Sequence, residues 1–111
     1  MDPAIAKQPL YQLLQAENIK EFNARRAQGD TVNLNGALLR GLDLRHMNAA
    51  GLDMRNSYMR GADLRGVDFR QTLLEGASLA ETKVSGCFFP NELSAEELRL
   101  SVEKGTRLRI R

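Results

Sequence analysis

A period of five residues runs through more than half of this chain and constrains its fold more than any other feature. From Val32 to Asn91, twelve consecutive blocks of five residues align without an insertion. The third place of every block is apolar, and seven of the nine glycines stand in the fifth place. An α-helix repeats its buried positions every three or four residues and a strand every two, so neither accounts for this period. The chain is therefore predicted to turn a corner once in each block.

The fifth place of the block is the predicted corner. Glycine adopts positive φ without steric cost and asparagine tolerates it next best, so Asn56 and Asn91 are expected to share the glycine conformation. His46 also stands at a corner and is expected to be a solvated or backbone-bonded turn residue. The third-place side chains are expected to point into the core: Leu34, Leu39, Leu44, Ala49, Met54, Met59, Leu64, Phe69, Leu74, Leu79, Val84 and Phe89.

The blocks resemble those of the pentapeptide-repeat family, whose consensus is A-(D/N)-L-X-X. The best matches are ADLRG at 62–66 and VDFRQ at 67–71. This resemblance implies an all-β solenoid, a right-handed quadrilateral β-helix with four blocks to a coil, so that residues 32–91 would form about three coils. At strand spacing of about 4.8 Å such a stack is on the order of 15 Å long. The flanks at 19–23 and 89–93 also resemble those of small bacterial members.

Short α-helical caps are expected at both ends, because so short a stack would expose unpaired backbone and core. Residues 1–31 and 92–111 are therefore interpreted as caps of a single domain. Asn18, with Glu21 three residues on, is a predicted N-cap, and Ser94 begins a capping box for a helix that Gly105 would end. Residues 106–111 alternate apolar and basic side chains, which predicts a basic strand tail that could add to an edge.

The second and fourth places point outward, and with four blocks to a coil, residues twenty apart share a face. One face, here the Asp63 face, mixes both charges: Asp43, Arg45, Asp63, Arg65, Lys83 and Ser85. Another, here the Tyr58 face, has no acidic residue: Leu38, Arg40, Tyr58, Arg60, Ser78 and Ala80. Leu38 and Tyr58 stand where the consensus has Asp or Asn, and Tyr with Arg is typical of binding hot spots. The alternative is that the N-terminal helices cover the side chains of Leu38 and Tyr58, which would then belong to the core and not to a binding surface.

Three further residues depart from the pattern. Leu73 and Phe88 are apolar in outward places of the last coil, and the C-terminal helix is expected to cover them. Cys87, the single cysteine, cannot form an intramolecular disulfide and is expected to be buried and unreactive.

Catalytic and metal-binding motifs are missing from the sequence, so a non-enzymatic protein without cofactor or metal is expected. No stretch near the N-terminus has the apolar core of a signal peptide, and no segment is apolar enough to cross a membrane, which favours the cytoplasm.

The favoured function is protein–protein interaction, through Leu38, Arg40, Tyr58 and Arg60, with either another protein or a second copy of this chain. Nucleic-acid binding is the alternative, through these outward arginines: Arg45, Arg65, Arg107, Arg109 and Arg111. The net charge of +2 is too small for a dedicated polyanion binder. Some long members of the family mimic DNA and bind type II topoisomerases through an acidic rod. The repeats here carry seven positive and six negative residues, which disfavours that role.

Overall fold

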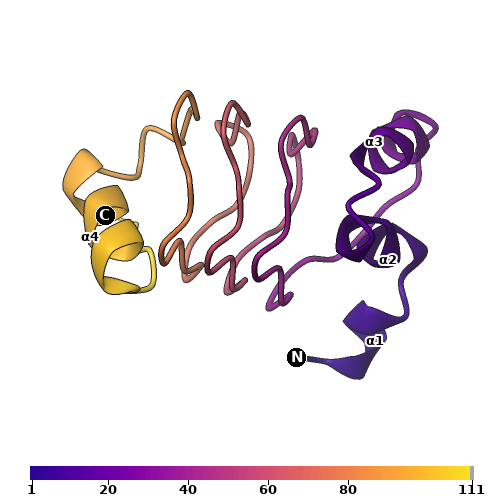
Figure 1. Ribbon diagram of the computed structural model, residues 1–111, viewed down its shortest axis with the longest axis horizontal. Coiled ribbons are helices and arrows are strands. Elements are labelled where there is room, and N and C mark those ends of the chain that lie inside the picture. The colour runs from indigo at the N-terminus through magenta and orange to yellow at the C-terminus, as the bar shows by residue number, and fades with distance from the viewer. Residues whose placement is uncertain (111) are drawn as a thin grey trace.

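Helices lie at the two ends of the molecule and stacked coils lie between them (Figure 1). The computed structural model describes residues 1–110. Helices α1 (Pro3–Ala6), α2 (Pro9–Gln15) and α3 (Ile19–Ala27) precede the repeats, and α4 (Ala95–Lys104) follows them. Within residues 1–110, no helix has the length and apolar character that a membrane span requires.

The coils are held in register by parallel pairing between residues twenty apart. The bridges are Leu38–Tyr58, Asp43–Asp63, Asp53–Leu73, Tyr58–Ser78, Asp63–Lys83 and Asp68–Phe88. Backbone hydrogen bonds follow the same register: the Tyr58 N–H donates to the Ala37 carbonyl at 2.9 Å, and the Leu39 N–H donates to the Tyr58 carbonyl at 2.8 Å. Each contact is an isolated bridge rather than a longer strand because a corner follows in every block. The period of twenty assumed for the faces is confirmed.

The core contains the third-place side chains, as the sequence predicts. The ten from Leu34 to Leu79 are buried, whereas Val84 and Phe89, in the last two blocks, are only partly buried. Phe69 is fully buried, and its ring stacks on that of Phe89 with 5.5 Å between the centroids. The core therefore runs through the stack and opens slightly where the repeats end.

The corners adopt positive φ at all seven fifth-place glycines, and Asn56 shares this conformation with a φ of 61°. His46 and Glu81 do so as well, with φ values of 71° and 58°. The prediction for Asn91 is wrong, because its φ is not positive. No further block follows it, and the chain turns there toward α4, with the Leu93 N–H donating to the Pro90 carbonyl at 3.1 Å.

Side chains from the N-terminal region pair with the open edge of the first coil on each of its faces. The Gln8 amide both donates to and accepts from the backbone of Asn33 at 2.7 Å, and the Asn23 amide accepts from the Asn48 N–H at 2.8 Å. The Tyr11 hydroxyl donates to the Leu38 carbonyl at 2.7 Å. A Glu17 carboxylate oxygen accepts from the Asp43 N–H. These polar side chains take the place of a preceding coil and satisfy backbone groups that would otherwise lack partners.

The predicted caps at both helices are confirmed. The Asn18 side chain accepts from the Glu21 N–H at 3.3 Å, and the Ser94 hydroxyl accepts from the Glu97 N–H at 3.1 Å. Gly105, with a φ of 74°, ends α4 in the left-handed conformation. Both signals depend on local geometry alone, which is why the sequence predicts them well.

The C-terminal tail adds to the edge of the last coil, but only over a short stretch. Arg107 forms an antiparallel bridge with Ser78, and the Leu108 N–H donates to the Ala77 carbonyl at 2.8 Å. Leu108 is buried, whereas Thr106 and Ile110 are exposed. The predicted apolar side of the tail is therefore reduced to one residue.

The prediction that α4 covers Leu73 and Phe88 is wrong. Their side chains are 53% and 56% exposed. Helix α4 instead packs across the end of the stack, where the Ser101 hydroxyl accepts from the Leu79 N–H at 2.9 Å. The Arg70 guanidinium lies over the Phe88 ring, 4.6 Å from its centroid, and shields part of it from water.

Candidate functional site

The four residues predicted to bind a partner line one hollow of about 450 Å³. This hollow, here the Tyr58 groove, also takes in residues from the end of α4 and the tail. Its lining is Leu38, Arg40, Tyr58, Arg60, Ser78, Ala80, Lys104, Gly105 and Arg107. The repeats thus supply one side of the groove and the C-terminal segment supplies the other.

The floor of the groove is a ladder of residues twenty positions apart. Leu38 pairs with Tyr58, and Tyr58 pairs with Ser78, so the three stand one above another. The side chains of Leu38 and Tyr58 are 40% and 38% exposed. Helix α2 bonds the backbone of Leu38 through Tyr11, whose pKa is raised by burial. The alternative that the N-terminal helices bury these side chains as core is therefore wrong.

Arg107 joins the groove through Tyr58, a contact that the sequence analysis missed. Its guanidinium lies 5.2 Å from the centroid of the Tyr58 ring and donates a hydrogen bond to the Tyr58 hydroxyl. The two residues are 49 positions apart and belong to no shared repeat. No local pattern could have placed them together, although the alternation at 106–111 did indicate that the tail would pair with an edge.

One carboxylate stands at the margin of the groove. Arg60 forms an ion pair with Glu81 at 3.4 Å, and both side chains are largely exposed. Glu81 occupies a fifth place, at a corner, so it is not among the second-place and fourth-place residues by which the faces were defined. Within residues 1–110, Arg40 and Lys104 form no ion pair.

The Asp63 face uses its arginines differently. The Asp63 carboxylate accepts from the Arg65 backbone N–H at 3.2 Å and from the Arg65 Nε and Nη2 atoms at 2.9 and 2.7 Å. Asp43 holds Arg45 in the same way. The pairs Asp53–Arg55 and Asp68–Arg70 repeat the arrangement on other faces. We call this arrangement the Asp-X-Arg clamp.

The clamp lowers the pKa of its carboxylate. The hydrogen bonds from the arginine two residues on lower the pKa of Asp43, Asp53 and Asp63 to about 2. The arginine side chains respond in the opposite sense, since the carboxylate raises the pKa of Arg65. A clamped arginine is thus charged but already has an anionic partner.

The arginines of the nucleic-acid alternative do not form one surface. Arg45 and Arg65 are clamped on the Asp63 face, whereas Arg107 lines the Tyr58 groove. Arg109 binds the buried carboxylate of Glu97 through Nε and Nη2, at 3.1 and 3.2 Å. Arg111 lies outside the described residues. Three of these five arginines are therefore held by carboxylates.

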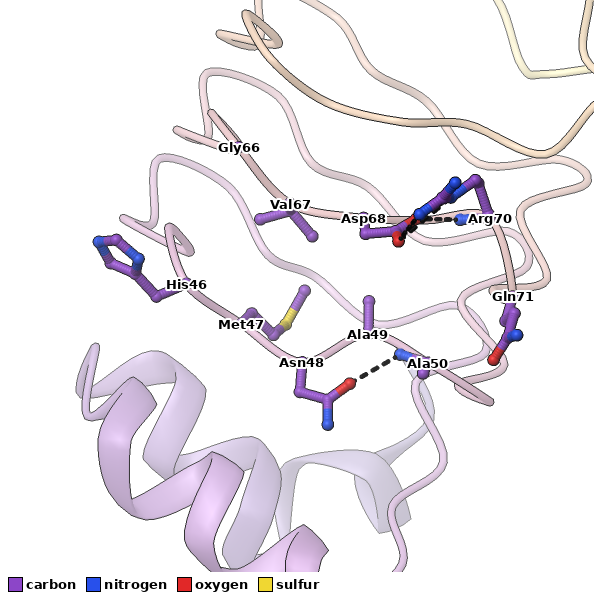
Figure 2. A pocket seen from close by; sticks show the side chains of 10 residues that line it. All are labelled: His46, Met47, Asn48, Ala49, Ala50, Gly66, Val67, Asp68, Arg70 and Gln71. Carbon is purple, nitrogen blue, oxygen red and sulfur yellow. Dashed lines mark hydrogen bonds and ion pairs between the residues drawn. The ribbon is translucent and has the colours of Figure 1, made fainter.

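A second hollow, of about 760 Å³, lies on the face of the coils that carries Asn48 and Asp68 (Figure 2). Its charged side chains, Asp68 and Arg70, bind each other at 2.7 Å, and the Asn48 side chain accepts from the Ala50 N–H at 3.1 Å. The His46 side chain stands at the far end of this hollow, away from Asp68 and Arg70 (Figure 2). Its two charged side chains are thus paired with each other, which favours the Tyr58 groove as the candidate site.

Cys87 is half-buried rather than buried. Its thiol donates to the Leu64 carbonyl at 2.9 Å, and burial raises the pKa of the thiol. The protonated form is therefore favoured, as expected for an unreactive cysteine.

Comparison with protein families gives one finding. The model of pentapeptide repeats matches residues 32–66 and 57–91, with eight copies. The two matches together span the residues in which the five-residue period occurs. No curated protein and no solved structure matches the chain.

Proposed function

Because this chain belongs to the pentapeptide-repeat family, we propose that its coils form a rigid, non-enzymatic scaffold whose Tyr58 groove binds a partner protein. The observation that carries the proposal is the groove itself. It holds two exposed apolar side chains, Leu38 and Tyr58, beside Arg40 and Arg60. Aromatic and arginine side chains in one hollow are the composition at which binding energy concentrates in protein interfaces.

The fold proposed for the scaffold is a right-handed quadrilateral β-helix of three coils, with helical caps. Family membership, the pairing of residues twenty apart and the positive φ at the corners support it. Such a scaffold suits binding, because a rigid surface loses little conformational entropy when a partner docks.

Nucleic-acid binding is the second candidate, favoured by the cationic residues Arg40, Lys104 and Arg107 in one hollow. The clamped arginines argue against it. The carboxylates that hold Arg45 and Arg65 would repel phosphates, and they interrupt the basic surface that a polyanion needs.

The test compares two aromatic side chains in equivalent places. Tyr58 and Phe88 both occupy second places, and each has an arginine over its ring, but only Tyr58 lies in the groove. Proteins captured by the wild-type chain are identified, and the affinity of the purified partner is measured by calorimetry. Tyr58→Ala is expected to weaken binding by about 2 kcal/mol, or about 30-fold, and Phe88→Ala to leave it unchanged.

Thermal melts of both variants serve as the folding control. Equal binding by wild type and Tyr58→Ala would place the interface elsewhere. Binding to nucleic acid, with a log–log salt slope near −0.9 for each phosphate neutralised, would favour the second candidate instead.

A further inference from the structure

We infer that the Tyr58 groove takes a short acidic segment of the partner protein, in which carboxylates flank one apolar side chain. The inference rests on the proposed function and adds the chemistry of the ligand. It follows from the charges that surround the groove and from the apolar floor between them.

The positive charges of the groove lack strong anionic partners within residues 1–110. Arg40 and Lys104 form no ion pair, and the bond that Arg107 makes goes to the neutral hydroxyl of Tyr58. Arg60 is paired with Glu81, but an ion pair between two exposed side chains contributes little and is easily exchanged. An anionic ligand would therefore gain charge-assisted hydrogen bonds without first separating a clamp.

Replacement of aspartate in the second place explains why these arginines are available. In the Asp-X-Arg clamp, the arginine of the fourth place is held by the carboxylate two residues before it. In the blocks of Arg40 and Arg60 the second place holds Leu38 and Tyr58 instead. One change per block therefore does two things: it exposes an apolar side chain and leaves the neighbouring arginine unclamped.

The apolar floor selects among anions. Leu38 and Tyr58 lie one above the other between the cationic side chains, so a ligand that carries charge alone would leave their surface in water. A peptide with an aliphatic or aromatic side chain between carboxylates fits both features.

Arg107 is compatible with such a ligand. Its guanidinium rests on the Tyr58 ring, and the N–H donors at the edge of a stacked guanidinium can still bind a carboxylate. The Arg107 guanidinium would then stack on the Tyr58 ring and donate hydrogen bonds to a carboxylate of the ligand.

A sugar–phosphate chain fits less well than a peptide. On the adjoining Asp63 face each arginine already has a carboxylate partner. A nucleic acid would therefore find few sites for phosphates outside the groove.

The experiment titrates four probes into isotope-labelled protein and follows backbone amide signals by NMR. The probes are acetyl-Asp-Glu-Phe-Asp-Glu-amide, the same peptide with Asn and Gln for the acids, the same peptide with Gly for Phe, and a ten-residue oligothymidylate. We expect saturable shifts around Tyr58 with the acidic Phe peptide, at a Kd below about 1 mM. The neutral peptide and the Gly peptide are each expected to bind at least tenfold more weakly.

A matched pair of double variants tests the role of the clamp. Arg40→Gln with Arg60→Gln removes two unclamped arginines, and Arg45→Gln with Arg65→Gln removes two clamped ones from the same places of the same coils. Both pairs lower the net charge equally. The first is expected to weaken binding of the acidic Phe peptide at least tenfold and the second less than twofold. Melting curves verify that both variants fold.

Several outcomes would overturn the inference, and they separate it from the proposed function. An acidic Phe peptide that gives no saturable shifts, or equal loss in both double variants, overturns the acidic ligand. A neutral Phe peptide that binds as tightly and depends on Tyr58 overturns the acidic ligand and leaves protein binding in place. Tighter binding of the oligothymidylate, with a steep salt dependence, overturns both.

Discussion

The Tyr58 face and the Asp63 face carry arginines at the same places of the same two coils, yet only those of the Asp63 face are clamped within their own blocks. On the Asp63 face, Asp43 and Asp63 each hold the arginine two residues on. On the Tyr58 face the corresponding side chains are Leu38 and Tyr58, and no carboxylate takes that role. Counting charges along the sequence does not distinguish the two faces; the residue in the second place does.

The clamp joins two residues of the same block, so its presence can be predicted from the sequence. The carboxylate of the second place accepts from the backbone N–H two residues on, as in an Asx-turn, and this directs its other oxygen toward the following arginine. Asp-X-Arg in an outward position of these repeats therefore predicts a neutralised pair, and an arginine without the aspartate predicts an available cation.

Loss of the shared core is expected to have the largest effect, because both faces depend on it. Phe69 is fully buried in the middle coil and stacks on Phe89. We expect Phe69→Ala to lower the free energy of unfolding by about 3–5 kcal/mol, measured by chemical denaturation, since a cavity would remain. Phe88→Ala, at an exposed position, is the control. A loss below about 1 kcal/mol would show that Phe69 does not support the faces.

Converting one face into the other should have the next largest effect. Leu38→Asp creates an Asp-X-Arg sequence with Arg40, and we expect the new carboxylate to clamp that arginine. Binding of the acidic Phe peptide should then weaken about tenfold, or about 1.4 kcal/mol, as measured by NMR titration. Leu38→Asn removes the same apolar side chain without adding charge and should weaken binding less. Equal loss in both variants would mean that clamping Arg40 is irrelevant.

Acid should abolish the difference between the faces. The pKa values of Asp43, Asp53 and Asp63 are lowered to about 2 from 3.8, so the ionised form is stabilised by folding. Their contribution to stability is complete above pH 4 or so and is lost as the pH falls toward about 2. We expect carboxyl carbon titrations with midpoints near 2 for these three residues. A titration midpoint near the usual aspartate pKa of 3.8 for Asp63 would show that the clamp does not form in solution.

Substitutions at the corners that follow the Asp63 face should change the free energy of unfolding least. His46 has a φ of 71°, which costs about 1 kcal/mol or more for a residue with a Cβ. We expect His46→Gly to raise the free energy of unfolding by roughly 0.5–1 kcal/mol, measured by chemical denaturation, after the larger chain entropy of glycine is subtracted.

Gly66 is the matched control one coil on, with a φ of 78° and no atom within 4 Å of an added Cβ. Gly66→Ala should therefore cost about 1 kcal/mol through its backbone alone. A destabilising His46→Gly would show that the imidazole makes a contribution of its own.

Periodic and local features of this molecule could be predicted, and features that join distant segments could not. The inward places of Leu64 and Phe69 and the caps at Ser94 and Gly105 follow from spacing and turn chemistry. The exposure of Leu73 was predicted wrongly, because an apolar side chain in an outward place does not reveal whether a helix covers it. In the candidate site, the sequence placed the four residues of the repeats on one face. Arg107 was not predicted there, because it belongs to the tail and lies 49 positions from Tyr58.

The side chains that pair with the first coil determine where pairing along the stack stops. Gln8, Tyr11, Glu17 and Asn23 each occupy a backbone donor or acceptor that another extended chain could otherwise use. A chain from which residues 1–31 had been removed would present these groups to its neighbours, and an open edge of this kind is a template for fibre growth. The N-terminal region therefore ends the pairing along the stack, and Tyr11, which bonds the Leu38 backbone, does so beside the groove itself.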